Sequence, residues 1–205
     1  MPENKNYVFI NTLKLLNTPN PVICQLFSHA LDLDMAEDPM TIFQGFGYQH
    51  YLGKKHGRSG LAFWHPGFCY ACNRVAFEQM GGLYEHSILG SGDHNMALSL
   101  IKKAHTSVNS EVTVSYKKHV LEFQKRCDGI VLRYTPGVIK HFFHGKKINR
   151  KYVDRWKILV KHKYDPLRHV TYDANGLLIP TPEFPPNLLF DILDYFFSRD
   201  EDAKF

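Results

Sequence analysis

The feature that most constrains this chain is the stretch 64–101, where glycine-rich breaks separate segments suited to regular structure. It reads as a short apolar strand, a helix that stops at Gly81-Gly82, a polar loop and a second helix. The loop 90–95 has the sequence Gly-Ser-Gly-Asp-His-Asn and places the acid Asp93 at the start of the second helix. Two glycines just before a charged residue indicate a backbone that passes close to a ligand. We therefore expect the working site at this loop.

Helical and strand-like patterns alternate along the rest of the chain, which predicts an α/β or α+β fold. Apolar residues at helical spacing predict helices at 7–16, 74–80, 96–103, 114–127, 150–163 and 187–198. Short apolar runs predict a buried strand at 21–27 and further strands at 61–73, 130–134 and 138–143. The segment 40–52 is aromatic and ambiguous, with a weak helical pattern.

The composition is that of a globular protein with a sizeable core, because 44% of its 205 residues are hydrophobic and 22% are charged. This length suits a single domain across 1–205. The sequence shows neither a signal peptide nor an apolar run of about 18 residues, so neither secretion nor a membrane span is expected. The four cysteines are accordingly expected to be reduced thiols in the cytoplasm.

The net charge of +5 is too modest to choose between nucleic acid, a membrane surface and a phosphorylated substrate. The basic residues of 146–163 spread around a predicted helix and no nucleic-acid motif accompanies them, so no nucleic-acid partner is expected. The pattern instead predicts a helix with a solvated outer face. Its inner face, which would pack on the domain, is formed by Val153, Trp156, Leu159 and Val160.

The carboxylate of Asp93 has two interpretations. At a helix start it could serve as a general base that deprotonates an acceptor hydroxyl. An isolated aspartate at such a position is more often only a helix cap. The flanking glycines and His94 favour the general base, but they do not exclude the helix cap.

A second candidate group follows the predicted strand 138–143. His141 and His144, with Gly145 and two lysines behind them, could bind a metal ion and neutralise a phosphate. On an extended strand the two imidazoles would point to opposite faces, so we expect one to be functional and the other structural. The alternative is that both are ordinary surface histidines.

Two shorter patterns carry less weight. Cys69 and Cys72 have the spacing of a redox pair or half a zinc site, but no second pair exists, and two small buried side chains are expected. Asp32 and Asp34 have the form of an Asp-x-Asp metal motif. Because the pair runs into an acidic turn that ends at Pro39, we expect a solvated loop and a coincidental match.

Three segments, in order, resemble motifs of one enzyme family. Residues 64–68 with Arg74 and 80–84 resemble "GF-x-A-x-x-R … GG-L/F", and residues 89–94 resemble "G-x-G-D/E-D". Residues 141–145 with 150–155 resemble "H-x-x-HG … R-x-Y-x-x-R". The set is similar to the C-terminal, acceptor-side half of a GT-A-fold glycosyltransferase, as in glycosyltransferase-like proteins of large DNA viruses and some bacteria. The resemblance covers about 7–175 and leaves 176–205 as an extension.

The resemblance implies a partial GT-A-like mixed sheet flanked by helices, without the N-terminal nucleotide-binding βαβ portion and its Asp-x-Asp motif. It implies sugar transfer, of the hexosyltransferase type, from a nucleotide-sugar donor to a hydroxyl of a glycan or protein acceptor. The chain would not act alone, and a separate chain could supply the donor-binding half. If the protein is viral, the host cytoplasm or the virion would be its location.

The resemblance also assigns roles to residues. Asp93 would be the catalytic base of an inverting transfer. His144, or as second choice His141, would bind Mn²⁺ or Mg²⁺ on the donor diphosphate. The residues expected to bind substrate are Trp64, His65, Gly67, Gly92, His94, Lys146 and Arg150. The alternative is a non-catalytic glycan- or protein-binding module derived from a glycosyltransferase.

Overall fold

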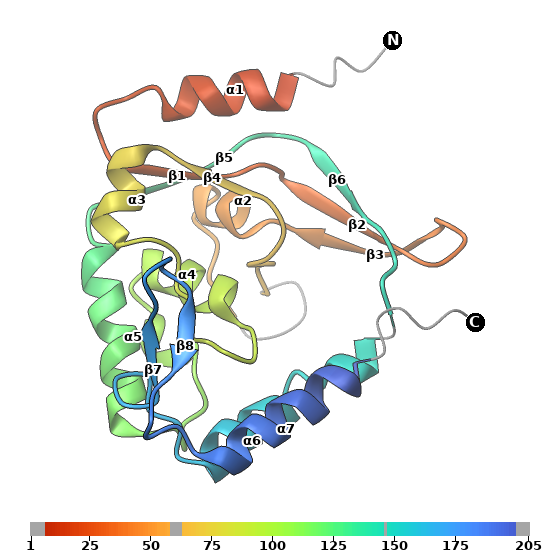
Figure 1. Cartoon of the computed structure of the whole chain (residues 1–205). Helices are drawn as coiled ribbons and strands as arrows, with labels where there is room; N and C mark the ends of the chain where they lie inside the picture. The colour runs from red at the N-terminus through yellow and green to blue at the C-terminus, as the bar shows by residue number, and fades with distance from the viewer. Residues whose placement is uncertain (1–6, 58–62, 146, 200–205) are drawn as a thin grey trace. The chain divides into compact units, whose positions relative to one another are not determined.

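The computed structural model describes residues 7–57, 63–145 and 147–199 (Figure 1). The chain divides into two compact units, each described by itself below. Unit 1 comprises 1–83 and 126–143, and unit 2 comprises 84–125 and 144–205. Small sheets, mixed in unit 1, and helices make up the structure, so the expectation of an α/β chain is confirmed at that level. The expectation of a single domain stays a prediction.

Unit 1 is built on two three-stranded mixed sheets. In the first, β1 (Val22–Gln25) lies between antiparallel β4 (Tyr70–Cys72) and parallel β5 (Val131–Tyr134). All four residues of β1 are buried, which confirms the buried strand predicted there. The helices of this unit are α1 (Tyr7–Leu16), α2 (Phe46–Tyr51) and α3 (Arg74–Met80), and α3 ends at left-handed Gly81 as predicted.

In the second sheet, β2 (His29–Leu33) lies between antiparallel β3 (Pro39–Gln44) and parallel β6 (Val138–His141). The strands β5 and β6 follow one another as predicted, but they belong to different sheets. Where the chain passes from one sheet to the other, Ser28 donates hydrogen bonds of 2.9 Å from both its backbone N–H and its hydroxyl to the carbonyl of Gly137. The two crossings, β1 to β2 and β5 to β6, are thus held side by side.

Several local predictions in unit 1 are wrong. Asp32 lies on β2 and is buried, not in a solvated loop, whereas Asp34 does form a turn by accepting from the backbone N–H groups of residues 36 and 38. The ambiguous segment 40–52 divides into most of β3 and the helix α2. Among the described residues of 61–73, only β4 is a named strand. Cys69 is exposed, while partial burial of Cys72 raises the pKa of its thiol.

The side chain of Gln25 organises the core of unit 1. It is 0% exposed, and its Oε1 accepts a 2.9 Å hydrogen bond from the backbone N–H of Gly47 at the start of α2. Its Nε2 donates to the carbonyls of His65 and Gly67, both at 3.1 Å. One buried amide therefore bonds to three backbone groups. The carbonyl of His65 also accepts from the backbone N–H of Phe46, so an apolar side chain would leave the other two, on Gly47 and Gly67, without this partner.

We predict that Gln25→Leu lowers the free energy of unfolding by about 3 to 5 kcal/mol, because each buried backbone group left without a partner costs about 1–3 kcal/mol. The matched control is Gln79→Leu, since Gln79 is exposed and donates to two exposed carbonyls. That variant should cost less than about 1 kcal/mol. Urea unfolding followed by circular dichroism measures both, and equal losses would contradict the assignment.

Unit 2 contains the remaining helices and a β-hairpin. The hairpin pairs β7 (Val170–Tyr172) with β8 (Leu178–Pro180) across a turn that begins at Asp173. The α-helices are α4 (Gly92–Leu100), α5 (Val114–Arg126, whose last residue is assigned to unit 1), α6 (Asp154–Lys161) and α7 (Pro186–Phe197), with 3₁₀ turns η2 (Ala104–Thr106) and η3 (Lys147–Arg150). Predicted helices therefore exist at all four places, although α6 is shorter than predicted. Leu159 packs inward as expected, whereas Val153 is exposed because it only precedes α6.

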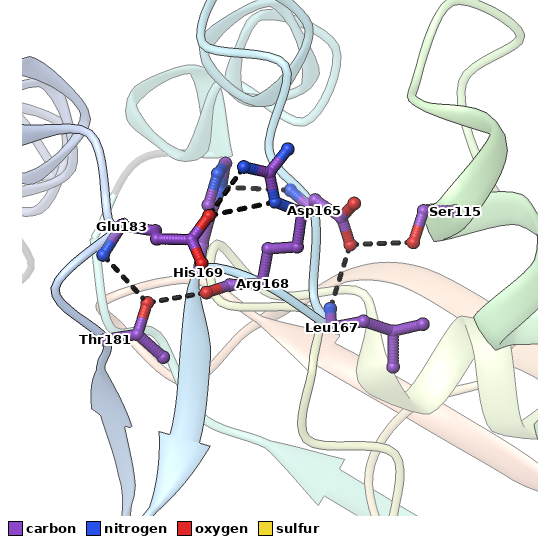
Figure 2. A network of polar contacts seen from close by, with 7 residues as sticks. All are labelled: Ser115, Asp165, Leu167, Arg168, His169, Thr181 and Glu183. Atoms are coloured by element: carbon purple, nitrogen blue, oxygen red, sulfur yellow. Dashed lines mark hydrogen bonds and ion pairs between the residues drawn. The ribbon is translucent and has the colours of Figure 1, made fainter.

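A polar network ties the connection after α6 to its neighbours in unit 2 (Figure 2). The Asp165 carboxylate accepts from the Ser115 hydroxyl at 2.7 Å and from the backbone N–H of Leu167 at 2.9 Å. The backbone N–H of Asp165 donates to Nδ1 of His169 at 3.1 Å. Beside them, Arg168 pairs with Glu183. Because the backbone N–H of Asp165 donates to it, Nδ1 of His169 must carry a lone pair. The arrangement therefore favours the neutral form of the imidazole.

Burial lowers the pKa of His169, which makes unit 2 sensitive to acid. The unfolded chain takes up the proton first, at its ordinary pKa of about 6.5, so stability is complete above that pH and falls as the pH drops toward the lower folded-state pKa. We predict that His169→Asn, which retains an acceptor and cannot titrate, flattens the melting temperature between about pH 7 and pH 5. The control variant is His105→Asn, since His105 is exposed. It should keep the pH dependence of the wild-type melting temperature. Identical curves for all three proteins would contradict this role.

Candidate functional site

The loop at the start of α4 presents Asp93 to solvent. Helix α4 begins at Gly92, and Asp93 lies exposed in its first turn, as the sequence predicts. The N-cap residue is Ser91, whose side chain makes no capping hydrogen bond. Oδ1 of Asp93 accepts a 2.8 Å hydrogen bond from the backbone N–H of His94. The carboxylate is therefore held at the helix start without occupying the cap position.

The backbone around Asp93 has little freedom. Gly90 and Ser91 both have left-handed conformations, with φ of 92° and 76°, which is uncommon for a residue with a side chain such as serine. At Gly92 an added Cβ would lie 2.7 Å from the carbonyl oxygen of Tyr84. The two glycines of the motif therefore have structural reasons to be glycine. Their approach to a ligand stays a prediction.

Arg155, on α6, packs against this loop and was not singled out as a site residue from the sequence. Its Nη2 donates to the hydroxyl of Ser91, and its guanidinium carbon lies 5.1 Å from the ring centroid of Tyr152. An added Cβ on Gly90 would lie 2.6 Å from Nη1 of Arg155. The spacing R-x-Y-x-x-R was the signal in the sequence that pointed to this arginine. We interpret Arg155 as the side chain that holds residues 90 and 91 in their left-handed conformations.

Buried polar side chains anchor the first turn of α4. Asn95 is 0% exposed, and its Nδ2 donates to the hydroxyl of Ser87 at 2.7 Å. That hydroxyl lies 3.1 Å from the phenol oxygen of Tyr116, and burial raises the pKa of this phenol and keeps it neutral. The carboxylate of Asp93 therefore stands on a helix start that is fixed by Arg155 and by this buried network.

We predict that Gly92→Ala displaces the loop, because its methyl group would meet a backbone carbonyl that cannot rotate away as a side chain can. The expected cost is about 1–3 kcal/mol, with faster hydrogen exchange at residues 90–95. The control is Gly176→Ala, since Gly176 is left-handed (φ 77°) but an added Cβ meets nothing within 4 Å. It should leave exchange at 90–95 unchanged, and the same change in both variants would contradict the steric explanation.

Unit 1 contains a second group of predicted site residues, centred on His141. Nδ1 of His141 lies 2.8 Å from Oδ1 of Asp32, the residue directly opposite it in the parallel pair of β2 and β6. The side chain of Asp32 is 4% exposed and that of His141 is 24% exposed. Asp32, which the sequence presented as a coincidental metal motif, is thus the partner of a candidate site histidine.

Aromatic rings surround this pair. The ring of Phe68 lies 4.5 Å from that of His141 and is stacked at 4.3 Å and 5° on that of His65. Nδ1 of His65 accepts a 3.2 Å hydrogen bond from the backbone N–H of Gly67. Three predicted site residues, His65, Gly67 and His141, therefore gather around Phe68. Trp64 is only 4% exposed and makes edge contacts with the rings of Phe46 and His56, so this tryptophan has a packing role.

His144 lies in unit 2 and has different neighbours. A guanidinium nitrogen of Arg150 lies 2.6 Å from its Nε2 and 2.7 Å from its Nδ1. A cation at this distance opposes the binding of a second cation by the same ring. The structure thus gives His141 a carboxylate neighbour and His144 a guanidinium neighbour. The choice of His144 before His141 as the metal ligand stays a prediction. Lys146 lies outside the described residues.

Within 7–57, 63–145 and 147–199, no three His, Cys, Asp or Glu side chains are grouped so that they could hold a metal ion. None of the helices in these ranges is both long and apolar enough to cross a membrane. The proposed Mn²⁺ or Mg²⁺ stays a prediction.

Comparison with known proteins finds no matching family model, no matching curated protein and no matching solved structure.

Proposed function

We propose that this chain is the acceptor-side part of a glycosyltransferase that moves a sugar from a nucleotide-sugar donor to a hydroxyl group. The observation that carries the proposal is Asp93, an exposed carboxylate on a helix start whose backbone is fixed on both sides. The GT-A resemblance of the ordered motifs supports the same class.

A general base for hydroxyl transfer must reach the proton it removes and hold its own position while the acceptor binds. Asp93 meets the second requirement through Arg155, which packs on Gly90 and bonds to Ser91. Asp93 can also reach the proton, because it is exposed on the first turn and an acceptor hydroxyl can approach it from solvent. In the proposed reaction the carboxylate takes the acceptor proton as the hydroxyl oxygen attacks the sugar carbon and the diphosphate leaves.

The leaving diphosphate would need positive charge. In unit 2, Arg150 supplies a guanidinium beside His144, and its backbone carbonyl accepts from the Tyr195 hydroxyl at 3.0 Å, which fixes its place next to α7. A divalent ion would supply further charge neutralisation when bound. No step proposed here depends on that ion.

The second candidate function is a non-catalytic protein- or glycan-binding module. The observation in its favour is the exposed apolar surface of α7, to which Phe190, Leu193 and Phe197 contribute. Large apolar side chains gathered on one exposed helix are typical of a protein-binding surface. This candidate requires no role for Asp93.

The two candidates differ in their dependence on Asp93 and on nucleotide. We predict that the purified chain transfers sugar to a hydroxyl acceptor when it is combined with a donor-binding chain, Mn²⁺ and a panel of nucleotide-diphosphate sugars. Asp93→Asn should lower kcat by about 100-fold or more, since general-base catalysis contributes 10²–10⁴-fold. The control is Asp154→Asn, another exposed first-turn aspartate in unit 2, which should keep the wild-type rate.

Transfer that is equally fast in Asp93→Asn would reject the base assignment. Absence of a thermal shift with every common nucleotide diphosphate would exclude donor binding by this chain. Retained binding to glycans or proteins under those conditions would favour the non-catalytic module.

A further inference from the structure

The carboxylate of Asp32 occupies a position where strands of this kind usually bury an apolar side chain. Its neighbours Ala30 and Leu33 on β2 are 0% and 1% exposed. A carboxylate buried at such a place costs several kcal/mol unless it is paired and hydrogen-bonded. Here the partner is the imidazole of His141, which comes from β6 and is 109 residues away in the sequence. The pairing therefore offsets part of the cost of burying Asp32, through its Oδ1.

The contact also fixes the chemistry of the imidazole. An ionised carboxylate can only accept hydrogen bonds, so Nδ1 of His141, 2.8 Å from Oδ1 of Asp32, must carry a proton. In the neutral ring the lone pair then lies on Nε2. In a histidine held in this way by a carboxylate, the tautomer and the ring orientation are both fixed.

The ring of His141 also has an aromatic neighbour. Phe68 packs on His141 at 4.5 Å and on His65 at 4.3 Å. The backbone of Phe68 has φ of 74°, a left-handed conformation that costs a bulky residue free energy and persists only where its surroundings enforce it. The ring contacts of Phe68 supply that enforcement. Three independent constraints thus orient His141: strand pairing, the carboxylate and the phenyl ring.

We propose that Asp32 is a positioning residue that holds His141 as the Nδ1–H tautomer, so that Nε2 is the working atom of the imidazole and accepts a hydrogen bond from a sugar hydroxyl. The identity of the ligand rests on the proposed glycosyltransferase function. The way in which the imidazole is held does not. The site differs from the loop at Asp93, which lies in unit 2.

The test is the ring tautomer, read at a fixed pH of about 8 from long-range ¹H–¹⁵N correlation spectra of the full chain. In the wild type, His141 should give the pattern of the Nδ1–H tautomer. In Asp32→Ala it should shift toward the Nε2–H tautomer, which free histidine prefers. A role for Asp32 in packing alone would not change the tautomer.

The matched control is Asp34→Ala, because Asp34 is the other aspartate of the same Asp-x-Asp pattern and accepts only from turn N–H groups. It should leave His141 unchanged. Asp32→Asn provides a second variant of nearly equal size in case Asp32→Ala does not fold, and it should weaken the Nδ1–H preference. Circular dichroism checks the fold of each variant.

An Nε2–H pattern for His141 in the wild type, or an unchanged Nδ1–H pattern in a folded Asp32 variant, would overturn the proposal, whatever the enzyme assay gives. In the transfer assay, Asp32→Asn should lower kcat about 10-fold or more with little change in KM, whereas Asp34→Ala should not. If the tautomer responds and no transfer is found for the wild type, the positioning stands and the proposed sugar ligand is rejected.

Discussion

Unit 1 depends on two strands from late in the sequence that pair in parallel with two early strands. β5 and β6 come back after residues 84–125 and pair with β1 and β2 in parallel, so each sheet joins segments about a hundred residues apart in sequence. Parallel pairs of this kind need a long connection, and here the connection includes the helices α4 and α5 of unit 2. The shared carbonyl of Gly137, which receives both hydrogen bonds of Ser28, fixes the register at the crossing.

Contacts between segments distant in sequence also explain why unit 1 can bury polar side chains in its strands. Gln25 on β1 and Asp32 on β2 each face groups that come from distant segments, namely the backbone of 47 and 65–67 for the amide and the imidazole of His141 for the carboxylate. Each group is satisfied only when the long-range contacts have formed. Buried polar groups of this kind tie a unique register to the fold, because a register slip would leave them without partners.

Local patterns predicted local structure well. The helices at α1, α3, α5 and α7, the buried strand β1 and the acid in the first turn of α4 all follow from spacing and turn residues. The partner of Asp32 could not be predicted, because it depends on strand pairing across 109 residues. Two further tertiary contacts could not be predicted either. The carbonyl of Tyr84 leaves no room for a side chain at Gly92, and Arg155 contacts residue 91 across 64 positions of the sequence.

The two candidate sites use carboxylates in opposite ways, and the difference follows from burial. Asp93 is exposed, so water stabilises its charge and it can meet a ligand directly. Asp32 is buried, so its charge is usable only through the hydrogen bond to His141, and any ligand meets the imidazole instead. An Asp-x-Asp pattern read as two equivalent metal ligands misses this distinction, since Asp34, two residues away, merely closes a turn. The side chain's surroundings, more than its identity or spacing, therefore decide which atom of each site can act.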